Sequence, residues 1–324
     1  MRQGHFLYLS RADVVAVNIP MRDIIDALLP AFRLKGEGRV EMPPKIGIHP
    51  APDAFLHAMP AFIGDLRSVG VKWVSGYPQN QVRGLPYING LLILNDPETG
   101  IPVAVMDCTW ITGMRTGAAS ALAARYLARP DSRTIGILGC GLQGRTNLLA
   151  LRELFPLQAA YAYDVVPEAA ERYAAEMSGR TGVRVEVVTE PRNAVEGMDI
   201  VVTSGPILRR PHATIKAGWL KPGAFASPVD FDSYFAPEAL RQASKFCTDD
   251  IEQLRYYQRV GYFQRIPGVY ADLGEIVSGR KPGRQRPDEI IICANLGLAL
   301  EDMAVAPLVY QEAIRKGIGT WLPL

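Results

Sequence analysis

Three glycines near the middle of the chain have the spacing of a loop that binds a dinucleotide: Gly139, Gly141 and Gly144. The apolar run 134–138 precedes them and a helical pattern over residues 145–151 follows, so we predict a strand, a tight turn and a helix. In such a turn the first glycine makes the bend and the second lets the backbone approach a pyrophosphate. The third lets the helix pack on the strand, and the helix N-terminus holds the anion. A glycine turn with a purely structural role is the alternative.

An acidic residue stands where dinucleotide-binding proteins contact the adenosine ribose. Asp164 ends the apolar run 159–163 and lies twenty residues after Gly144. Its carboxylate would accept a hydrogen bond from the ribose 2′-OH and would repel the 2′-phosphate of NADP. Tyr163 and Val165 supply no cation that could bind that phosphate. The predicted cofactor is therefore NAD.

The segments after the glycine loop predict an α/β fold with a Rossmann-type, doubly wound parallel sheet. Apolar runs alternate with helical patterns, and these runs cover residues 183–188, 199–204, 223–229 and 245–248. Ligands bind such sheets at the carboxyl ends of the strands. We therefore expect one crevice to be lined by residues 139–144, Asp164, residues 203–205 with Ser204 among them, and residues 230–232.

The segments before the loop predict a mixed-sheet α+β domain. A helical pattern runs from Ser10 to about Gly36. Successive strands of a mixed or antiparallel sheet follow at residues 42–48, 55–62, 69–74, 87–94 and 101–106. A helix rich in small residues, 109–128, then leads into the nucleotide-binding domain.

The end of the chain is predicted to return to the first domain. A strand at 289–293 runs into a helix through Asp302, and a last helix covers about 307–316. The predicted domains are residues 1–126, to which residues 305–324 return, and the NAD-binding domain at residues 127–304.

Three cations of the first domain are candidates for binding an anionic substrate: Lys45, Lys72 and Arg115. Arg115 is the strongest of them, because a guanidinium offers a rigid fork to a carboxylate or phosphate and its small neighbours leave room for a ligand. Lys72 lies on a predicted strand whose other face is apolar, and it could instead be solvated. Arg115 could likewise extend its charge to the surface.

Asp232 follows the predicted strand 223–229, at the end of the sheet where a nicotinamide is expected. A carboxylate there could accept a proton from a substrate amine or activate a water, with its ionisation tuned by nearby cations. Asp230 is the rival for this role. A solvated aspartate in a loop with Ser233 is the interpretation without a function.

Composition excludes several classes of partner and site. The 324 residues include 35 basic and 33 acidic ones, with a formal net charge of +2, so no basic patch predicts binding to nucleic acid or to a membrane. The four cysteines form no C-x-x-C pair and the four histidines have no metal-ligand spacing, so we expect neither a disulfide framework nor a metal site. No apolar run predicts a signal core or a membrane span, and we expect a cytoplasmic protein with a small-molecule ligand.

Together these segments resemble the ornithine cyclodeaminase and mu-crystallin family over nearly the whole chain. The likeness rests on Pro44-Lys45, residues 71–78 (VKWVSGYP) followed by Gly84-Leu85, residues 96–100 (DPETG), residues 114–118 (MRTGA), the glycine loop with Gln143, and residues 297–302. The resemblance implies that Lys45, Lys72 and Arg115 bind a substrate α-carboxylate, with Asp232 as acid/base and Lys72 beside it as a catalytic residue. It also implies a homodimer joined through the first domain. The implied cofactor contacts are Arg115, Thr116, Gly139, Gly141, Leu142, Gln143, Gly144, Asp164, Val165, Ser204, Asp232 and Asn295.

The chemistry of this family takes place at the Cα–N bond of an amino or imino acid. The resemblance implies that hydride passes from Cα to NAD, that Asp232 accepts amine protons, and that the cations fix Cα beside the nicotinamide ring. A cyclodeaminase would convert L-ornithine to L-proline and ammonia without net redox change, whereas other relatives are amino-acid dehydrogenases or imine and ketimine reductases. A non-enzymatic, mu-crystallin-like binding protein and a structural protein with a vestigial fold are the alternatives.

The predicted substrate pocket departs from that of ornithine cyclodeaminases. Those enzymes usually carry an acid near the position of His57, a threonine near Tyr87, and a Gly-Gly-Asp-Cys-Pro-Gly-Lys-like loop where this chain has residues 230–236. We expect His57 and Tyr87 to line the substrate side chain in a bulkier, more aromatic pocket. The sequence leaves the identity of that side chain open.

Overall fold

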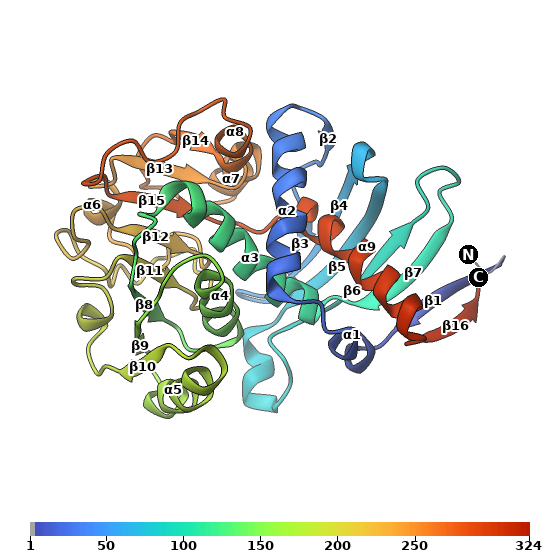
Figure 1. Ribbon diagram of the computed structural model, residues 1–324, viewed down its shortest axis with the longest axis horizontal. Helices are drawn as coiled ribbons and strands as arrows, with labels where there is room; N and C mark the ends of the chain where they lie inside the picture. The colour runs from blue at the N-terminus through green and yellow to red at the C-terminus, as the bar shows by residue number, and fades with distance from the viewer. Residues whose placement is uncertain (1–3) are drawn as a thin grey trace. The chain divides into compact units, whose positions relative to one another are not determined.

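The computed structural model describes residues 4–324, which form two compact units (Figure 1). The first unit is the chain up to Arg115 together with Leu298–Leu324, and the second is Thr116–Gly297. Helix α3 (Thr109–Leu127) carries the chain from the first unit into the second. The boundary predicted after residue 126 lies on this same helix.

The first unit contains a mixed sheet of eight strands, in the order β16-β1-β7-β6-β5-β4-β2 with β3 paired to β4. β1 and β7 are parallel, and the other pairs are antiparallel. The strands are β1 (His5–Leu9), β2 (Val40–Glu41), β3 (Ile46–Ile48), β4 (Phe55–Ile63), β5 (Ser68–Gly76), β6 (Ile88–Asn95), β7 (Pro102–Asp107) and β16 (Thr320–Pro323). The strand predicted at 42–48 is shorter than expected, and β1 and β16 were not predicted.

The strands of this sheet have one covered and one open face. In β5 the residues Ser68, Gly70, Lys72 and Val74 are buried, whereas Trp73 between them is exposed. Alternation of this kind follows from the two-residue period of a strand. The covered face lies against helix α9 (Ala299–Lys316), which contacts β4, β5 and β6 (Figure 1). Lys72 points to the covered face, so the interpretation of Lys72 as a solvated side chain is wrong.

The single helix predicted from Ser10 to Gly36 is two helices, α1 (Arg11–Val17) and α2 (Met21–Gly36). The Ser10 side chain caps α1 by accepting a hydrogen bond from the backbone N–H of Asp13. Asn18 ends α1 in the left-handed region at φ 51°. Pro20 then precedes α2, because its fixed φ and missing N–H suit the start of a helix rather than its interior.

The end of the chain differs from the prediction. The two helices expected around Asp302 and at 307–316 are one helix, α9, with Pro307 inside it. Pro307 removes one backbone hydrogen bond, but the helix is held by a largely buried face that includes Met303, Val305 and Val309. Beyond α9, β16 pairs with β1.

The second unit confirms the predicted doubly wound fold. Its sheet has the order β10-β9-β8-β11-β12-β15-β13-β14, and all of the pairs are parallel. The strands are β8 (Thr134–Leu138), β9 (Ala159–Tyr163), β10 (Arg184–Val187), β11 (Ile200–Thr203), β12 (Phe225–Pro228), β13 (Lys245–Thr248), β14 (Ala271–Asp272) and β15 (Ile291–Ala294). The remaining helices of this unit are α4 (Leu142–Arg152), α5 (Pro167–Thr181), α6 (Pro237–Leu240), α7 (Ile251–Arg259), α8 (Leu273–Val277) and the short η3 (Pro191–Ala194). The short helices η1 (Gly64–Leu66) and η2 (Pro78–Arg83) belong to the first unit. Within residues 4–324, none of the helices has the length and apolarity that crossing a membrane requires.

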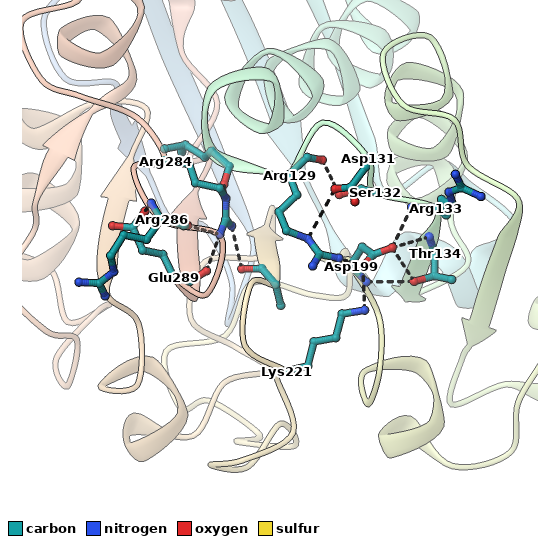
Figure 2. A network of polar contacts seen from close by, with 12 residues as sticks. Arg129, Asp131, Ser132, Arg133, Thr134, Asp199, Lys221, Arg284, Arg286 and Glu289 are labelled. Carbon is teal, nitrogen blue, oxygen red and sulfur yellow. Dashed lines mark hydrogen bonds and ion pairs between the residues drawn. The ribbon is translucent and has the colours of Figure 1, made fainter.

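A polar network joins the amino ends of the central strands of this sheet (Figure 2). Asp199, just before β11, accepts hydrogen bonds from the backbone N–H groups of Arg133 (2.8 Å) and Thr134 (3.1 Å). It also pairs with Arg129 and with Lys221, whose Nζ lies 2.7 Å away. Burial alone would raise the pKa of Asp199, but the bonds from Lys221 and the backbone lower it to about 2. The ionised carboxylate therefore ties β8 to β11.

Candidate functional site

The glycine loop has the geometry that a dinucleotide site needs. Gly139 has φ +99°, a conformation that side chains rarely adopt, and a Cβ there would lie 2.8 Å from the backbone of Ser204. A Cβ on Gly144 would lie 2.4 Å from the Gly139 carbonyl oxygen. A Cβ on Gly141 would meet no atom of residues 4–324 within 4 Å. Internal packing thus accounts for the first and third glycines, while the second faces open space.

Helix α4 presents its N-terminus beside this space. Its N-cap residue is Gly141, which has no side chain to accept hydrogen bonds from the first backbone N–H groups. Leu142 is 48% exposed, and Gln143 is partly buried. The unsatisfied N–H groups and the helix dipole together favour an anion at this point.

Asp164 lies against the glycine loop, as the sequence predicted. Its carboxylate accepts hydrogen bonds from the backbone N–H groups of Cys140 (2.7 Å) and Val166 (3.0 Å). The neighbouring Val165 is exposed. These two bonds fix the orientation of the Asp164 carboxylate at the carboxyl end of β9.

Further residues at the carboxyl ends of the strands are linked to the loop. Ser204 Oγ donates a hydrogen bond to the Gly139 carbonyl (2.7 Å). Asp230 accepts hydrogen bonds from Thr203 Oγ1 (2.6 Å) and from the Gly205 N–H (2.9 Å). The structure therefore brings together most of the segments that were expected to line one crevice.

Asn295 and Thr116, two further predicted cofactor contacts, are buried within the second unit. The Asn295 amide donates to Ser227 Oγ (3.0 Å) and Ser120 Oγ (3.4 Å). Thr116 is followed by Gly117, where a Cβ would lie 2.4 Å from the Thr146 carbonyl oxygen of α4. The small residues of α3 thus allow close contact between two helices.

The two aspartates after β12 have different surroundings. Asp230 has no accessible surface and both of its oxygens are bonded, and burial raises its pKa to about 7. Asp232 is 6% exposed, and its Oδ1 has no hydrogen-bond partner in the described chain. Burial raises the pKa of Asp232 as well. Its unpartnered oxygen makes Asp232 the better candidate to exchange a proton with a ligand, even though Asp230 has the larger shift.

Phe231 between the two aspartates explains why they differ. Its φ of +64° is uncommon for a residue with a side chain and costs on the order of 1 kcal/mol. The ring is held by an aromatic cluster, with centroids 4.6 Å from Tyr257 and 5.0 Å from Phe263. The packing of Phe231 therefore fixes the sharp backbone turn between Asp230 and Asp232.

In the first unit, Lys72 and Arg115 form one buried cluster with two acids of α9. Lys72 Nζ lies 2.6 Å from Asp302 Oδ2 and donates a hydrogen bond to Thr112 Oγ1 (3.4 Å). Arg115 donates through Nε to Asp302 Oδ1 (3.1 Å) and through Nη1 to Glu301 Oε2 (2.6 Å). Lys72 is 0% exposed and Arg115 is 5% exposed, so the interpretation of Arg115 as a surface cation is also wrong.

Burial and the neighbouring charges shift the pKa values of the groups in this cluster. Burial lowers the pKa of Lys72, the charge of Arg115 lowers it further, and Asp302 opposes both. Burial would also lower the pKa of Arg115, but Asp302 and Glu301 outweigh it and raise this pKa. Burial raises the pKa of Glu301. Glu301 Oε1 and Asp302 Oδ2 accept no well-aligned hydrogen bond from the described residues, although Oδ2 is close to Lys72.

The other predicted substrate residues are placed differently. Lys45 is buried, and His57 lies half-buried on β4. Lys45 and Lys72 both lie within electrostatic reach of His57. Tyr87 precedes β6, where its carbonyl accepts a hydrogen bond from the Tyr77 N–H (3.0 Å). Tyr87 is thus well along β6 from Leu92, the strand partner of Lys72.

The reasoning from sequence assigned no role to Glu301 and Asp302. They belong to the segment 297–302 that carries the family likeness, and they open α9. Two consecutive acids in the first turn of a helix are also a common response to the helix dipole. Only the long-range contacts, 186 and 187 residues apart, distinguish these acids as partners of Arg115.

Comparisons with known proteins agree with this geometry. The family model of the ornithine cyclodeaminase/mu-crystallin family matches residues 7–317. An alanine dehydrogenase of Archaeoglobus fulgidus is 36% identical over an alignment of 322 residues that covers 97% of this chain and 97% of that protein. The structure of Thermococcus litoralis Δ1-pyrroline-2-carboxylate reductase with NADH and L-proline has a TM-score of 0.88 and 35% identity, covering 97% of this chain and 99% of that one. An archaeal alanine dehydrogenase dimer with bound NAD has a TM-score of 0.87 and 35% identity, covering 98% and 99%. The chain belongs to the ornithine cyclodeaminase/mu-crystallin family.

Proposed function

We propose that this protein is an NAD-dependent oxidoreductase that acts at the Cα–N bond of an α-amino acid or of the corresponding imine. The observation that carries this proposal is the buried cluster of Lys72 and Arg115 in a chain whose second unit has a dinucleotide-binding loop. Similarity to an alanine dehydrogenase and to a reductase solved with NADH and L-proline supports the same reaction class. The first unit would bind the substrate and the second would bind the cofactor.

The residues of the second unit fit NAD. The pyrophosphate would occupy the open space at Gly141 and accept hydrogen bonds from the N-terminus of α4. Asp164, already oriented by two backbone N–H groups, would accept a hydrogen bond from the adenosine ribose. When bound, the nicotinamide supplies the two-electron redox chemistry at Cα.

The cations of the first unit would bind and orient the substrate α-carboxylate. Arg115 uses Nε and Nη1 to bind the acids of α9, which leaves Nη2 for the substrate. The Lys72 ammonium has three protons, of which it donates one to Thr112, and it is held beside Asp302 by an ion pair. Lys45 would add a third positive charge. Because all three side chains are buried, their charges act on the carboxylate with little screening by water.

Asp232 would hold and move the proton of the reacting nitrogen. Loss of hydrogen from Cα requires the amine to be unprotonated, and the unpartnered Oδ1 is suited to accept its proton. Burial raises the pKa of Asp232, which brings it closer to the working range of an acid/base at neutral pH. In the reverse direction the same carboxyl group would protonate the imine nitrogen.

We also propose that the protein is a homodimer joined through the open face of the first sheet. Trp73, Leu91 and Phe62 on this face are 46%, 44% and 39% exposed. Trp73 is paired with Leu91 across β5 and β6, so these two large side chains are contiguous. An archaeal relative is a dimer. In sedimentation analysis the wild-type protein should be a dimer and Trp73→Glu should be a monomer. A wild-type protein that sediments as a monomer would rule the dimer out.

A panel of amino acids with NAD⁺ tests the proposed function. Stoichiometric NADH together with a 2-oxo acid or imine identifies a dehydrogenase, and NADH oxidation by cyclic imines identifies a reductase. Conversion of ornithine to proline and ammonia without net NADH identifies a cyclodeaminase. Asp232→Asn should lower kcat by roughly 10²–10⁴-fold while NADH still binds. NADH binding without turnover of any amino or imino acid would contradict an enzymatic role.

We propose a cytoplasmic location for the protein. Its four free, buried cysteines support this proposal, because the cytoplasm keeps thiols reduced.

A further inference from the structure

The covered face of the first sheet arranges its charged residues in two neighbouring rows, each of which crosses adjacent strands. In one row Met59 of β4 is paired with Lys72 of β5. In the next row His57 is paired with Gly47 of β3 and with Val74 of β5. Lys45 lies two residues before Gly47, so a strand-like period places it on the same face, beside Met59. The burial of Lys45 agrees with this position.

Helix α9 closes the covered face of the sheet on one side of the Lys72 row. On one side of the Lys72 row, a Cβ on Gly70 would lie 3.0 Å from Met303 Sδ of α9. Ser68 Oγ, one row further, donates a hydrogen bond to the Met303 carbonyl (2.6 Å). Helix α9 therefore covers that side. A side chain anchored through its α-carboxylate can then extend towards the other side, over the row of His57.

The His57 row offers aromatic surface. The His57 ring stacks on Phe55 with centroids 4.3 Å apart and an interplanar angle of 16°. The His49 ring lies edge-on to the His57 ring, with ring centroids 6.2 Å apart. The ring lies over Gly47, where a Cβ would be 2.2 Å from the imidazole carbon Cδ2. The position of His57 is therefore set by its neighbours on both sides.

The charged groups that act on His57 are basic, and the two acids of the Lys72 and Arg115 cluster are already engaged. Lys45 and Lys72 lie within electrostatic reach of His57. Asp302 contacts both Lys72 and Arg115, and Glu301 binds Arg115.

The pKa of His57 reflects its burial and the basic groups around it. Burial, then the charges of Lys45, His49 and Lys72, lower the pKa of His57 from 6.5 to about 3. A protonated imidazole would be a cation at this position. A substrate ammonium placed over the same ring would lose its hydration and meet the same positive charges.

We infer that the substrate is an α-amino acid, or its imine, whose side chain carries no positive charge, and that His57 is a specificity-determining residue. This inference rests on the proposed function of the same site. It excludes diamino acids, such as ornithine and lysine, as the preferred substrates. Uncharged side chains can pack on the rings of Phe55 and His57, and acidic side chains would be attracted by Lys45.

Calorimetry on the NADH-saturated protein tests the inference without requiring turnover. L-norvaline and L-ornithine differ by the δ-ammonium group, and L-norleucine and L-lysine form a second matched pair. We expect the cationic member of each pair to bind roughly 100-fold more weakly, because its charge is desolvated without a partner. Equal or tighter binding of ornithine would overturn the inference while leaving the proposed function in place. If neither amino acid binds, the inference and the proposed function both fail. If norvaline binds but is not turned over when NAD⁺ is supplied, only the proposed function fails.

Substitutions at His57 test its part in the discrimination. His57→Glu supplies the missing counter-ion, so the ornithine-to-norvaline affinity ratio should rise at least roughly tenfold. His57→Gln stays neutral and should keep the preference for norvaline. Gln311→Glu adds the same charge at an exposed position of α9 and should leave the ratio unchanged. A His57→Glu protein that binds norvaline with the wild-type ratio would overturn the role of His57. If this variant does not fold, the wild-type pairs still decide the inference on substrate class.

Discussion

Both units contain a cluster of opposite charges, but the two clusters are satisfied to different degrees. In the second unit, Asp199 accepts hydrogen bonds from two backbone N–H groups and forms ion pairs with Arg129 and Lys221 (Figure 2). The side chains of these two cations remain 28% and 31% exposed. Although Arg129 Nε lacks a hydrogen bond, both oxygens of Asp199 are bonded. The arrangement suits a cluster that holds strands together.

The cluster of the first unit is more deeply buried and has more polar atoms without a hydrogen bond. Lys72, Glu301 and Asp302 have no accessible surface, and one oxygen of each acid lacks a well-aligned hydrogen bond. Burying charges with unmet hydrogen bonds costs stability, so such a cluster contributes little to folding. We infer that the cluster of the second unit is structural, and we propose that the cluster of the first unit binds a ligand that completes it.

Asp302→Asn should have the largest effect, because it leaves Lys72 and Arg115 with one acid between them. The two cations then repel each other and are no longer held in place for the substrate carboxylate, so we expect kcat/KM for an amino acid to fall on the order of 10³-fold. Burial already lowers the pKa of Lys72 and Asp302 opposes this, so the KM of the variant should start to rise with pH at a lower pH than that of the wild type. Steady-state kinetics against pH measure both effects.

The matched control for Asp302→Asn is Glu312→Gln, near the exposed end of the same helix. Glu312 pairs with Arg315 at the surface, where ion pairs contribute little. We expect its kinetics to equal those of the wild type. An Asp302→Asn enzyme with wild-type kcat/KM and no change in pH dependence would show that the first cluster is structural after all.

Glu301→Gln should have a smaller effect on the same cluster. Glutamine keeps the length of the side chain and an oxygen that accepts the Arg115 hydrogen bond. Burial already raises the pKa of Glu301, so a neutral side chain at this position costs less than it would at an exposed glutamate. We expect kcat/KM to fall roughly tenfold, mainly through KM. A loss as large as that of Asp302→Asn would mean that the two acids are equivalent.

Asp199→Asn should change stability and leave kcat/KM unaltered. The folded-state pKa of Asp199, about 2, lies below its ordinary value of 3.8. Its contribution is therefore complete above pH 3.8 and is lost as the pH falls from about 4 towards about 2. Allowing for screening by solvent around the half-exposed cations, we expect a loss of about 1–2 kcal/mol at neutral pH. Urea unfolding at several pH values measures it, and lost activity at full stability would contradict the structural assignment.

Several elements were predictable because their signals are local. The strand, glycine turn and helix around Gly139 and Asp164 follow from spacing within one stretch of chain, and the structure confirms their fold. The alternating runs gave the parallel sheet for the same reason. Local signals failed at Asn18 and Pro307, since a left-handed residue split one predicted helix and packing on the sheet kept another continuous.

The amino-acid sequence by itself determined the glycine loop, the acid after β9 and the presence of Lys72, Arg115 and Asp232, because each is a residue type at a readable position. Only the tertiary structure decided what these side chains meet. Arg115 lies 186 residues from Glu301 along the chain, and no local pattern encodes that pairing. Burial and electrostatic coupling are properties of groups packed together in space, so the engaged acids and the neutral His57 became visible only in the folded chain.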